Sequence, residues 1–289
     1  MTELPDFWRV WSPCLSHVED TNLDLESINE LSSLIEDPVL VVGAGHGLLV
    51  QQLQKKGLKA DGVDSEPAMV AYAEKRRGLK LVLANGANMP FADASYKTSV
   101  IATGVVDWLD DEGQIRSILN EALRVTDDSG KVLVAFYRAS PSMEGLMRKL
   151  GLITDKGIWR ARRTFELFAL NPIASFAAVR REANLGFFSA FLTLIKGQIF
   201  LSRKERKVAK SVAGALKQAR RESGSPRLLI DSLPEFLPYR NEDGVRTLFR
   251  SLGIPIHRIM ILENCLVVHV AGKSGKSSRP AAGGDWLIR

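Results

Sequence analysis

Short apolar runs alternate with amphipathic segments over the first half of the chain. Five runs have the length and composition of buried strands, at Val39–Val42, 59–64, 79–83, 98–103 and 131–137. Between them, apolar residues recur at helical spacing at 48–56, 67–77 and 114–125. Strands and helices that alternate at this interval predict a parallel sheet with helices on both faces. A further helical pattern with one apolar face occupies much of 1–37.

The alternation stops at Pro141 and resumes near residue 228. Between these points the spacing predicts helix throughout, and after them it predicts a helix at 242–252 and strands at 256–262 and 265–271. Glu263 and Asn264 favour an antiparallel hairpin between those two strands. The tail is rich in Gly, Ser, Pro and Lys, which predicts disorder. We therefore predict a helical arm at 1–37, a core at 38–140 and 228–271, a helical insertion at 141–227 and a disordered tail at 272–289.

Charge separates the insertion from the rest of the chain. The formal net charge of the 289 residues is +6, but 141–227 alone holds 18 Lys and Arg against 6 Asp and Glu. The start of the chain has neither a basic stretch nor an apolar core, so we expect no signal peptide. Cys14 and Cys265 fit no metal or redox spacing, and we expect both thiols to stay reduced in the cytoplasm.

A glycine-rich turn directly follows the first predicted strand. Three alternating glycines, Gly43, Gly45 and Gly47, force a tight turn where the polar end of a ligand can approach the backbone. A dinucleotide site needs Gly-x-Gly-x-x-Gly, in which the third glycine lets the helix pack close to the strand. That third position is Leu48 here, so the turn does not fit a dinucleotide site.

The Gly-x-Gly-x-Gly turn resembles that of class I S-adenosylmethionine-dependent methyltransferases, of the methyltransferase domain type 11/25. The resemblance continues through 83–93, with its Met-Pro-Phe element, and through 121–131, and covers somewhat under half of the chain. It implies an α/β, Rossmann-like, seven-stranded and mostly parallel sheet, with an antiparallel C-terminal hairpin and an inserted helical lid.

The resemblance also implies which residues hold S-adenosyl-L-methionine. Asp64 ends the second predicted strand, and its carboxylate would accept from the ribose hydroxyls. The cofactor-binding residues implied are Gly43, Ala44, Gly45, Gly47, Asp64, Ser65, Asn85, Gly86, Ala87, Thr103 and Gly104. Gly43 and Gly45 would bring backbone amides near the methionyl part, and Gly86 and Ala87 would offer theirs to the adenine ring.

The chain departs from the family pattern at two positions. The acidic residue that accepts from the adenine amino group in this family corresponds to Asn85, which keeps an acceptor oxygen. An acidic residue usually stands two positions before the first glycine and helps to hold the cofactor's ammonium, but this chain has Val41. Binding of the ammonium then depends on backbone carbonyls or water.

The sequence holds no catalytic signature, and methyl transfer needs none when the acceptor is a good nucleophile. Three weak candidates for a base or a substrate contact are His17, His46 and Tyr239. For His46, a packing or solvated role is the stronger interpretation. We predict no metal site.

The insertion has three alternative interpretations. Phe, Leu and Ile cluster at 187–200 and basic residues flank them, which suits a lid packed on the core or peripheral contact of 180–207 with an anionic membrane. RNA binding fits less well because the aromatic residues are grouped rather than interleaved. We predict a methyltransferase for an apolar or amphiphilic small molecule such as a lipid, quinone or natural product. An RNA methyltransferase and a non-catalytic cofactor-binding relative are the alternatives.

Overall fold

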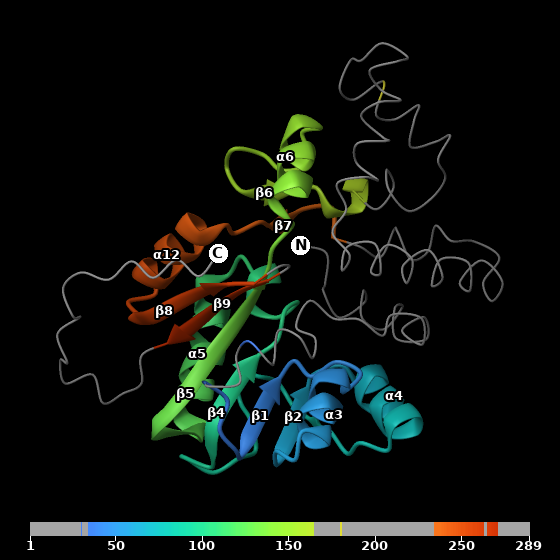
Figure 1. Cartoon of the computed structure of the whole chain (residues 1–289), viewed down its shortest axis with the longest axis vertical. Helices are drawn as coiled ribbons and strands as arrows, with labels where there is room; N and C mark the ends of the chain where they lie inside the picture. Colours follow the sequence, from blue (N-terminus) through green and yellow to red (C-terminus); the bar gives the residue numbers. More distant parts are fainter. Residues whose placement is uncertain (1–29, 31–33, 165–179, 181–233, 263–264, 271–289) are drawn as a thin grey trace.

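A seven-stranded sheet forms the centre of the molecule (Figure 1). The computed structural model describes residues 30, 34–164, 180, 234–262 and 265–270. The strand order is β3-β2-β1-β4-β5-β9-β8. The strands are β1 (Val39–Val42), β2 (Ala60–Asp64), β3 (Val82–Leu83), β4 (Tyr96–Ile101), β5 (Thr126–Tyr137), β8 (Ile256–Ile261) and β9 (Cys265–Val270).

Only β9 runs against its neighbours in this sheet. The pairs from β3 to β5 are all parallel, whereas β9 pairs antiparallel with both β5 and β8. The predicted mostly parallel sheet and the predicted C-terminal hairpin are therefore confirmed. The third strand is shorter than the predicted 79–83, because its pairing with β2 is limited to Val82 and Leu83.

The start of the fifth strand differs from the prediction. The fifth strand was predicted at 131–137, but β5 already begins at Thr126 and carries an irregularity in its pairing with β4. The Asp127 carboxylate accepts from the Ser129 amide and from the Lys97 ammonium, both at close range. Residues 127–130 thus form a bulge within the strand.

In the described part of the chain, four helices cover the two faces of the sheet, close to their predicted ranges. They are α3 (Leu48–Lys55), α4 (Pro67–Arg77), α5 (Glu112–Val125) and α12 (Glu242–Ser251). Pro67 occupies the first turn of α4 and the Glu66 side chain caps it by accepting from the Ala68 amide. Asp111 and Asn241 cap α5 and α12 in the same way.

Alternation along β1 divides the core into two layers. Leu40 and Val42 pack with residues of α5 and α12, while Val39 and Val41 pack on the opposite face with residues of α3 and α4. All four β1 side chains are buried. The central strand is therefore covered on both faces, as a parallel sheet requires.

A small unit beside the sheet joins two distant parts of the sequence. Helix α6 (Pro141–Lys149) is followed by β6 (Ile158–Trp159), which pairs antiparallel with β7 (Leu237–Pro238). The three elements lie together at the top of Figure 1. The prediction of helix throughout the insertion is wrong over its first part, because Ile158 and Trp159 form a strand whose partner lies far along the chain.

This unit has its own apolar core. Met143, Met147 and Trp159 are buried together with Leu237 and Tyr239. We call the region made of α6, β6 and β7 the side unit. Most of the predicted arm at 1–37, most of the insertion and the tail lie outside the described residues, so the lid and the 180–207 surface stay predictions. In the part that the structure covers, no helix has the length and apolarity to cross a bilayer.

Candidate cofactor and acceptor site

The glycine turn lies where β1 ends, at the carboxyl edge of the sheet. Gly43, Gly45 and Gly47 have φ values of 69°, 54° and 80°. A Cβ atom on Gly43 would lie 2.1 Å from Cγ2 of Val105, so a side chain there would collide with the loop after β4. A Cβ on Gly45 would meet no atom of the described residues within 4 Å. The turn is therefore closed on the side of Val105 and open above Gly45.

The amides of this turn already have acceptors within the chain. The amides of Gly43 and Ala44 both donate to the Val63 carbonyl, at 2.9 and 3.0 Å. The Gly45 amide donates to Oδ2 of Asp64 at 2.7 Å. These bonds fix the turn against the end of β2. A ligand above Gly45 would thus meet a rigid backbone surface. The amides of Gly43, Ala44 and Gly45 are already bonded within the chain, so the ligand would contact the shape of the turn more than these three donors.

Asp64 lies beside the turn with its carboxylate largely desolvated. Its Oδ1 accepts from the Glu66 amide at 2.9 Å, while Oδ2 receives the Gly45 amide. Burial raises the pKa of the Asp64 carboxyl above its ordinary value, and the two amide bonds oppose that rise. Each carboxylate oxygen has a second lone pair, so Asp64 retains capacity for a sugar hydroxyl. Ser65, next along the chain, is exposed.

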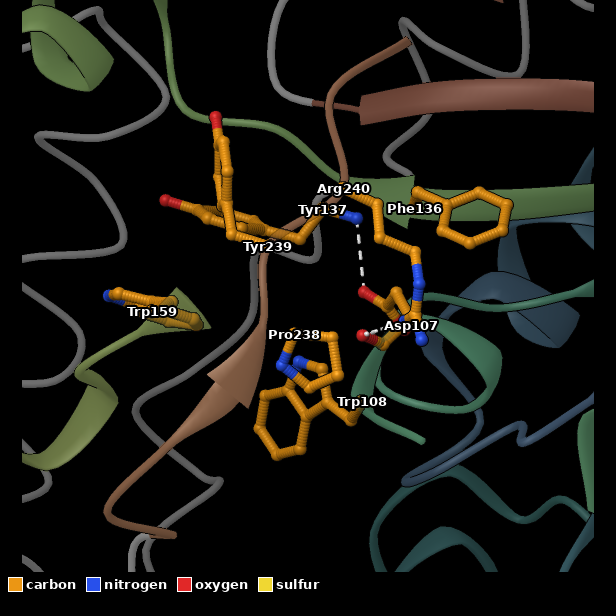
Figure 2. Close-up of a pocket in the computed structure, with 8 residues that line it drawn as sticks. All are labelled: Asp107, Trp108, Phe136, Tyr137, Trp159, Pro238, Tyr239 and Arg240. Atoms are coloured by element: carbon orange, nitrogen blue, oxygen red, sulfur yellow. Dashed lines mark hydrogen bonds between the residues drawn. The ribbon is translucent and has the colours of Figure 1, made fainter. Parts of the chain in front are cut away.

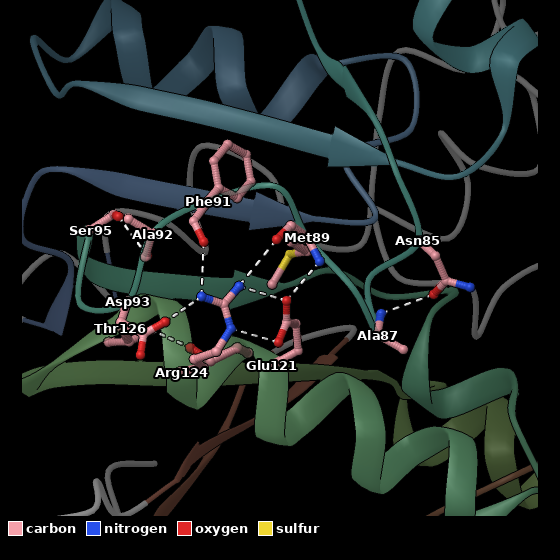
Figure 3. Close-up of polar contacts among 11 residues, drawn as sticks. Asn85, Ala87, Met89, Phe91, Ala92, Asp93, Ser95, Glu121, Arg124 and Thr126 are labelled. Carbon is pink, nitrogen blue, oxygen red and sulfur yellow. Dashed lines mark hydrogen bonds and ion pairs between the residues drawn. The ribbon is translucent and has the colours of Figure 1, made fainter.

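A second turn follows β3, the neighbour of β2. Oδ1 of Asn85 accepts from the Ala87 amide at 2.9 Å (Figure 3). The backbone amide of Asn88 donates to the Asn85 carbonyl. A Cβ on Gly86 would lie 3.0 Å from Cγ1 of Val42, so this turn packs closely on β1. The Ala87 amide, which the resemblance assigns to the adenine ring, is thus already used within the turn.

The chain that follows this turn is held to α5 by one arginine. All five N–H donors of the Arg124 guanidinium have partners: both oxygens of Glu121, the carbonyls of Met89 and Phe91, and Oδ1 of Asp93 (Figure 3). Glu121 also accepts from the Met89 amide at 2.7 Å. We call Arg124 and Glu121 the loop clamp. The guanidinium holds the pKa of the Glu121 carboxyl below its ordinary value.

A buried carboxylate, that of Asp107, joins the ends of β4 and β5. Asp107 accepts from the Gly104 amide at 2.7 Å and from the Tyr137 amide at 3.0 Å. Its side chain lies in the short 3-10 helix η3 (Val106–Trp108) and is only 4% exposed. Burial raises the pKa of the Asp107 carboxyl to about 6. Thr103 and Gly104, half-buried, are held at the strand end by this bond.

A mostly aromatic pocket lies between this strand end and the side unit (Figure 2). The rings of Tyr137 and Trp159 stack at a centroid distance of 5.5 Å and an angle of 18°. The lining residues are Asp107, Trp108, Phe136, Tyr137, Trp159, Pro238, Tyr239 and Arg240. The pocket therefore combines apolar surface with one buried carboxylate and one guanidinium.

Arg240 fixes the backbone of η3 on one side of this pocket. Its guanidinium donates to the carbonyls of Val106, Asp107 and Leu109, at 3.4, 3.0 and 2.6 Å. Burial lowers the pKa of Arg240, and the nearby Asp107 carboxylate opposes that shift. The loop between β7 and α12 is thereby fastened to η3, which connects the side unit to the sheet.

Two of the three candidate catalytic residues lie in surroundings that suit packing. The Tyr239 hydroxyl donates to Glu144 and accepts from the Ala139 amide, and burial raises its pKa well above the ordinary value. His46 is buried against Tyr72, with the Arg77 guanidinium near its Nδ1. Neither arrangement favours proton abstraction from a substrate. His17 lies outside the described residues.

The structure also brings in residues that the sequence did not single out. Trp159 and Pro238 reach the pocket through the pairing of β6 with β7. A tryptophan inside a basic insertion was the available signal for Trp159. Val41, where the family has an acidic residue, is fully buried in the apolar layer under α3.

Comparison with known proteins agrees with this geometry. Residues 39–130 match the family described as "Methyltransferase domain". Demethylmenaquinone methyltransferase of Corynebacterium urealyticum is 30% identical over 109 residues, which are 38% of this chain and 45% of that protein. The chain thus matches about half the length of this curated relative.

Two solved structures share the fold at low identity. The putative methyltransferase from the Haloferax volcanii complex with the Trm112 activator has a TM-score of 0.50 and 12% identity, covering 93% of this chain and 98% of that one. A Rhodobacter sphaeroides protein described as a putative Zn-dependent alcohol dehydrogenase has a TM-score of 0.51 and 9% identity, with the same coverage. At such identity both show the fold alone.

The sheet order, the glycine turn and the family match define the class of protein. The chain carries a class I S-adenosylmethionine-dependent methyltransferase domain. S-adenosylmethionine is the methyl donor of this family. Among named relatives, the chain is similar to demethylmenaquinone methyltransferases over 109 residues in one case and 101 in another.

Proposed function

We propose that this protein transfers a methyl group from S-adenosylmethionine to an apolar small molecule with a flat ring system, of the quinone class. The observation that carries the proposal is that the glycine turn and the aromatic pocket adjoin each other. The glycine turn packs on Val105, and Asp107, two residues further on, lines the aromatic pocket. A donor held at the turn and an acceptor packed against the aromatic side chains that line this pocket would therefore be neighbours, and proximity is what methyl transfer chiefly requires.

The residues at the strand ends fit the cofactor. The open space above Gly45 admits a ligand, and Asp64 offers acceptor lone pairs in a desolvated place. We assign cofactor binding to Gly43, Ala44, Gly45, Gly47, Asp64, Ser65, Asn85, Gly86, Ala87, Thr103 and Gly104. When bound, S-adenosylmethionine supplies an electrophilic methyl group on its sulfonium. The chain itself orients that group and excludes water.

The quinone class rests on two supports. The relatives that match at about 30% identity are named for demethylmenaquinone, although the match covers under half of each. The pocket independently offers aromatic faces from both the sheet and the side unit, and aromatic side chains pack well on flat rings. A lipid or another natural product with such a ring would meet the same surface.

Positioning, and not proton transfer, is the role we assign to the pocket residues. Both oxygens of Asp107 accept from backbone amides, and the Tyr239 hydroxyl donates to Glu144. A reduced quinone ring carries electron-rich carbon and oxygen atoms, so it can attack the methyl group without a strong base nearby.

Two measurements test the proposal. Titration calorimetry should detect S-adenosylmethionine, and Asp64→Ala should weaken its binding at least tenfold, because a charged acceptor for the ribose is lost. Asp61→Asn, on the same strand and bonded to Tyr96, should leave binding within twofold. Failure of the wild-type protein to bind at millimolar cofactor would refute the proposal.

Transfer of labelled methyl groups then separates the acceptors. We expect product with a reduced demethylated naphthoquinone, and none with a mixed RNA substrate. Product with RNA alone would favour the RNA methyltransferase alternative, and cofactor binding without any product would favour a non-catalytic relative.

A further inference from the structure

The amide group of Asn85 has a fixed orientation. The Ala87 amide is a donor, so the Asn85 atom that faces it at 2.9 Å must be the oxygen. The other end of the side chain is then Nδ2, which points away from the turn (Figure 3). Asn85 is exposed, and within the described part of the chain Nδ2 has no hydrogen-bond partner. Asn85 therefore offers a donor to whatever binds at the end of β3.

Reversing this orientation would be unfavourable. A flipped amide would place its NH2 group against the Ala87 N–H, so that two donors faced each other. The turn itself is held by the Asn88 amide bond, by the close packing of Gly86 on Val42 and by the loop clamp. The donor end of Asn85 is thus a stable feature of the surface.

The purine of a bound cofactor would meet this donor. Asp64 and Leu83 are register partners on β2 and β3, and Asn85 follows Leu83 by two residues. If Asp64 holds the ribose, the base extends toward the end of β3. Adenine presents an acceptor, N1, beside its 6-amino donor. An amide N–H suits N1, whereas a carboxylate at this position would suit the amino group.

We propose that Asn85 is a specificity-determining residue that recognises a ring nitrogen of the purine by donating to it and does not recognise the 6-amino group. This inference rests on the proposed function, since it needs the cofactor at the strand ends. Its consequence is a base site that tolerates loss of the 6-amino group. The resemblance had implied the opposite contact, in which the Asn85 oxygen accepts from that amino group.

The test compares two ligands on three proteins. Calorimetry measures the dissociation constants of S-adenosylhomocysteine and of its analogue with purine in place of adenine, which lacks only the amino group. For the wild-type protein we expect the two constants to agree within about threefold. For Asn85→Asp we expect the purine analogue to bind at least about tenfold more weakly than S-adenosylhomocysteine, since a charged acceptor then loses its donor.

Asn88→Asp is the matched control. It adds the same charge three residues further on, at another exposed asparagine of the same turn. Its ligand ratio should equal that of the wild-type protein. Asn85→Ser keeps a side-chain oxygen that can accept from the Ala87 amide, but it removes the Nδ2 donor that points away from the turn. It should weaken both ligands by a similar factor and leave their ratio near one, and it substitutes for Asn85→Asp if that variant misfolds.

The outcomes are distinct. A wild-type ratio of ten or more would overturn the inference and leave the proposed function intact, because the cofactor would bind with its amino group recognised. An unchanged ratio in Asn85→Asp would likewise overturn it, by removing Asn85 from the base site. Absence of binding of either ligand to the wild-type protein would reject the proposed function together with this inference.

Discussion

The cofactor side and the acceptor side of the candidate site are formed by different kinds of groups. On the cofactor side, at the ends of β1, β2 and β3, backbone amides, glycines and short polar side chains set the shape. On the acceptor side, between η3, β5 and the side unit, large aromatic side chains pack against one another. The first half tolerates few substitutions at its turns, whereas the second can change its lining while the backbone stays in place. Cofactor binding is therefore the more constrained property.

The largest expected effect follows from a side chain at the first glycine. Gly43→Ala places a Cβ 2.1 Å from Val105 and forces alanine to a φ of 69°. We expect it to lower the free energy of unfolding by about 2–4 kcal/mol, measured by urea denaturation.

Gly45→Ala is the matched comparison. The φ of Gly45 is 54°, but in the part of the chain that the structure describes its Cβ would meet no atom within 4 Å. The stability loss should be only about 1 kcal/mol, whereas cofactor affinity should fall, because the methyl group enters the open space above the turn. Equal stability losses for the two variants would contradict our account of the turn.

Of the two binding functions, loss of the loop clamp should weaken cofactor binding alone and leave acceptor binding unchanged. Arg124→Gln removes donors from two carbonyls and two carboxylates, and leaves the mostly buried Glu121 without its partner. We expect a loss of about 2–3 kcal/mol in stability and a several-fold rise in the cofactor dissociation constant. Arg246→Gln, in an exposed pair with Glu242, should change stability by less than about 0.5 kcal/mol.

Asp107 makes stability depend on pH at the junction of the two halves. Burial raises the pKa of the Asp107 carboxyl in the folded protein to about 6, above its ordinary value of 3.8, so the folded state binds the proton more tightly. Protonated Asp107 therefore contributes about 1–3 kcal/mol to the free energy of unfolding below pH 4. This stabilisation is lost as the pH rises through 6.

Measurement of this effect needs the variant as reference. His269, whose pKa burial lowers to about 4, acts in the opposite direction between pH 4 and 6.5. The difference in unfolding free energy between the wild-type protein and Asp107→Asn, followed from pH 4.5 to 7.5, isolates the Asp107 contribution. A difference that does not vary with pH would refute the assignment.

The smallest expected effect concerns the acceptor side. Trp159→Leu removes the stack on Tyr137 and should weaken quinone binding by about two- to tenfold, while the cofactor dissociation constant stays unchanged. Quenching of tyrosine and tryptophan fluorescence by the quinone measures its dissociation constant for the wild-type protein and for the variant. Ile158→Leu, at the neighbouring exposed position of β6, is the control and should behave as wild type. A parallel loss of cofactor affinity would show that the two halves are coupled.

The sequence predicts the cofactor half better than the acceptor half for a physical reason. Glycine spacing, Pro67 and the apolar runs act through local backbone geometry, so the strands, the helix starts and the turn could be recognised from neighbouring residues. The pairing of Trp159 with Leu237 depends on contacts across a long stretch of chain, which no local pattern encodes. The orientation of the Asn85 amide depends on a single backbone donor two residues away, and residue type alone does not fix it.

The pairing of β6 with β7 has a consequence for how this protein can diverge. Because the chain leaves the side unit at β6 and returns beside it at β7, the two ends of residues 160–236 meet at one small ladder. Excursions with adjoining ends are the places where domains accept insertions, deletions and transplanted segments. A chimera that carries a relative's segment between Trp159 and Leu237 should therefore keep the parent fold.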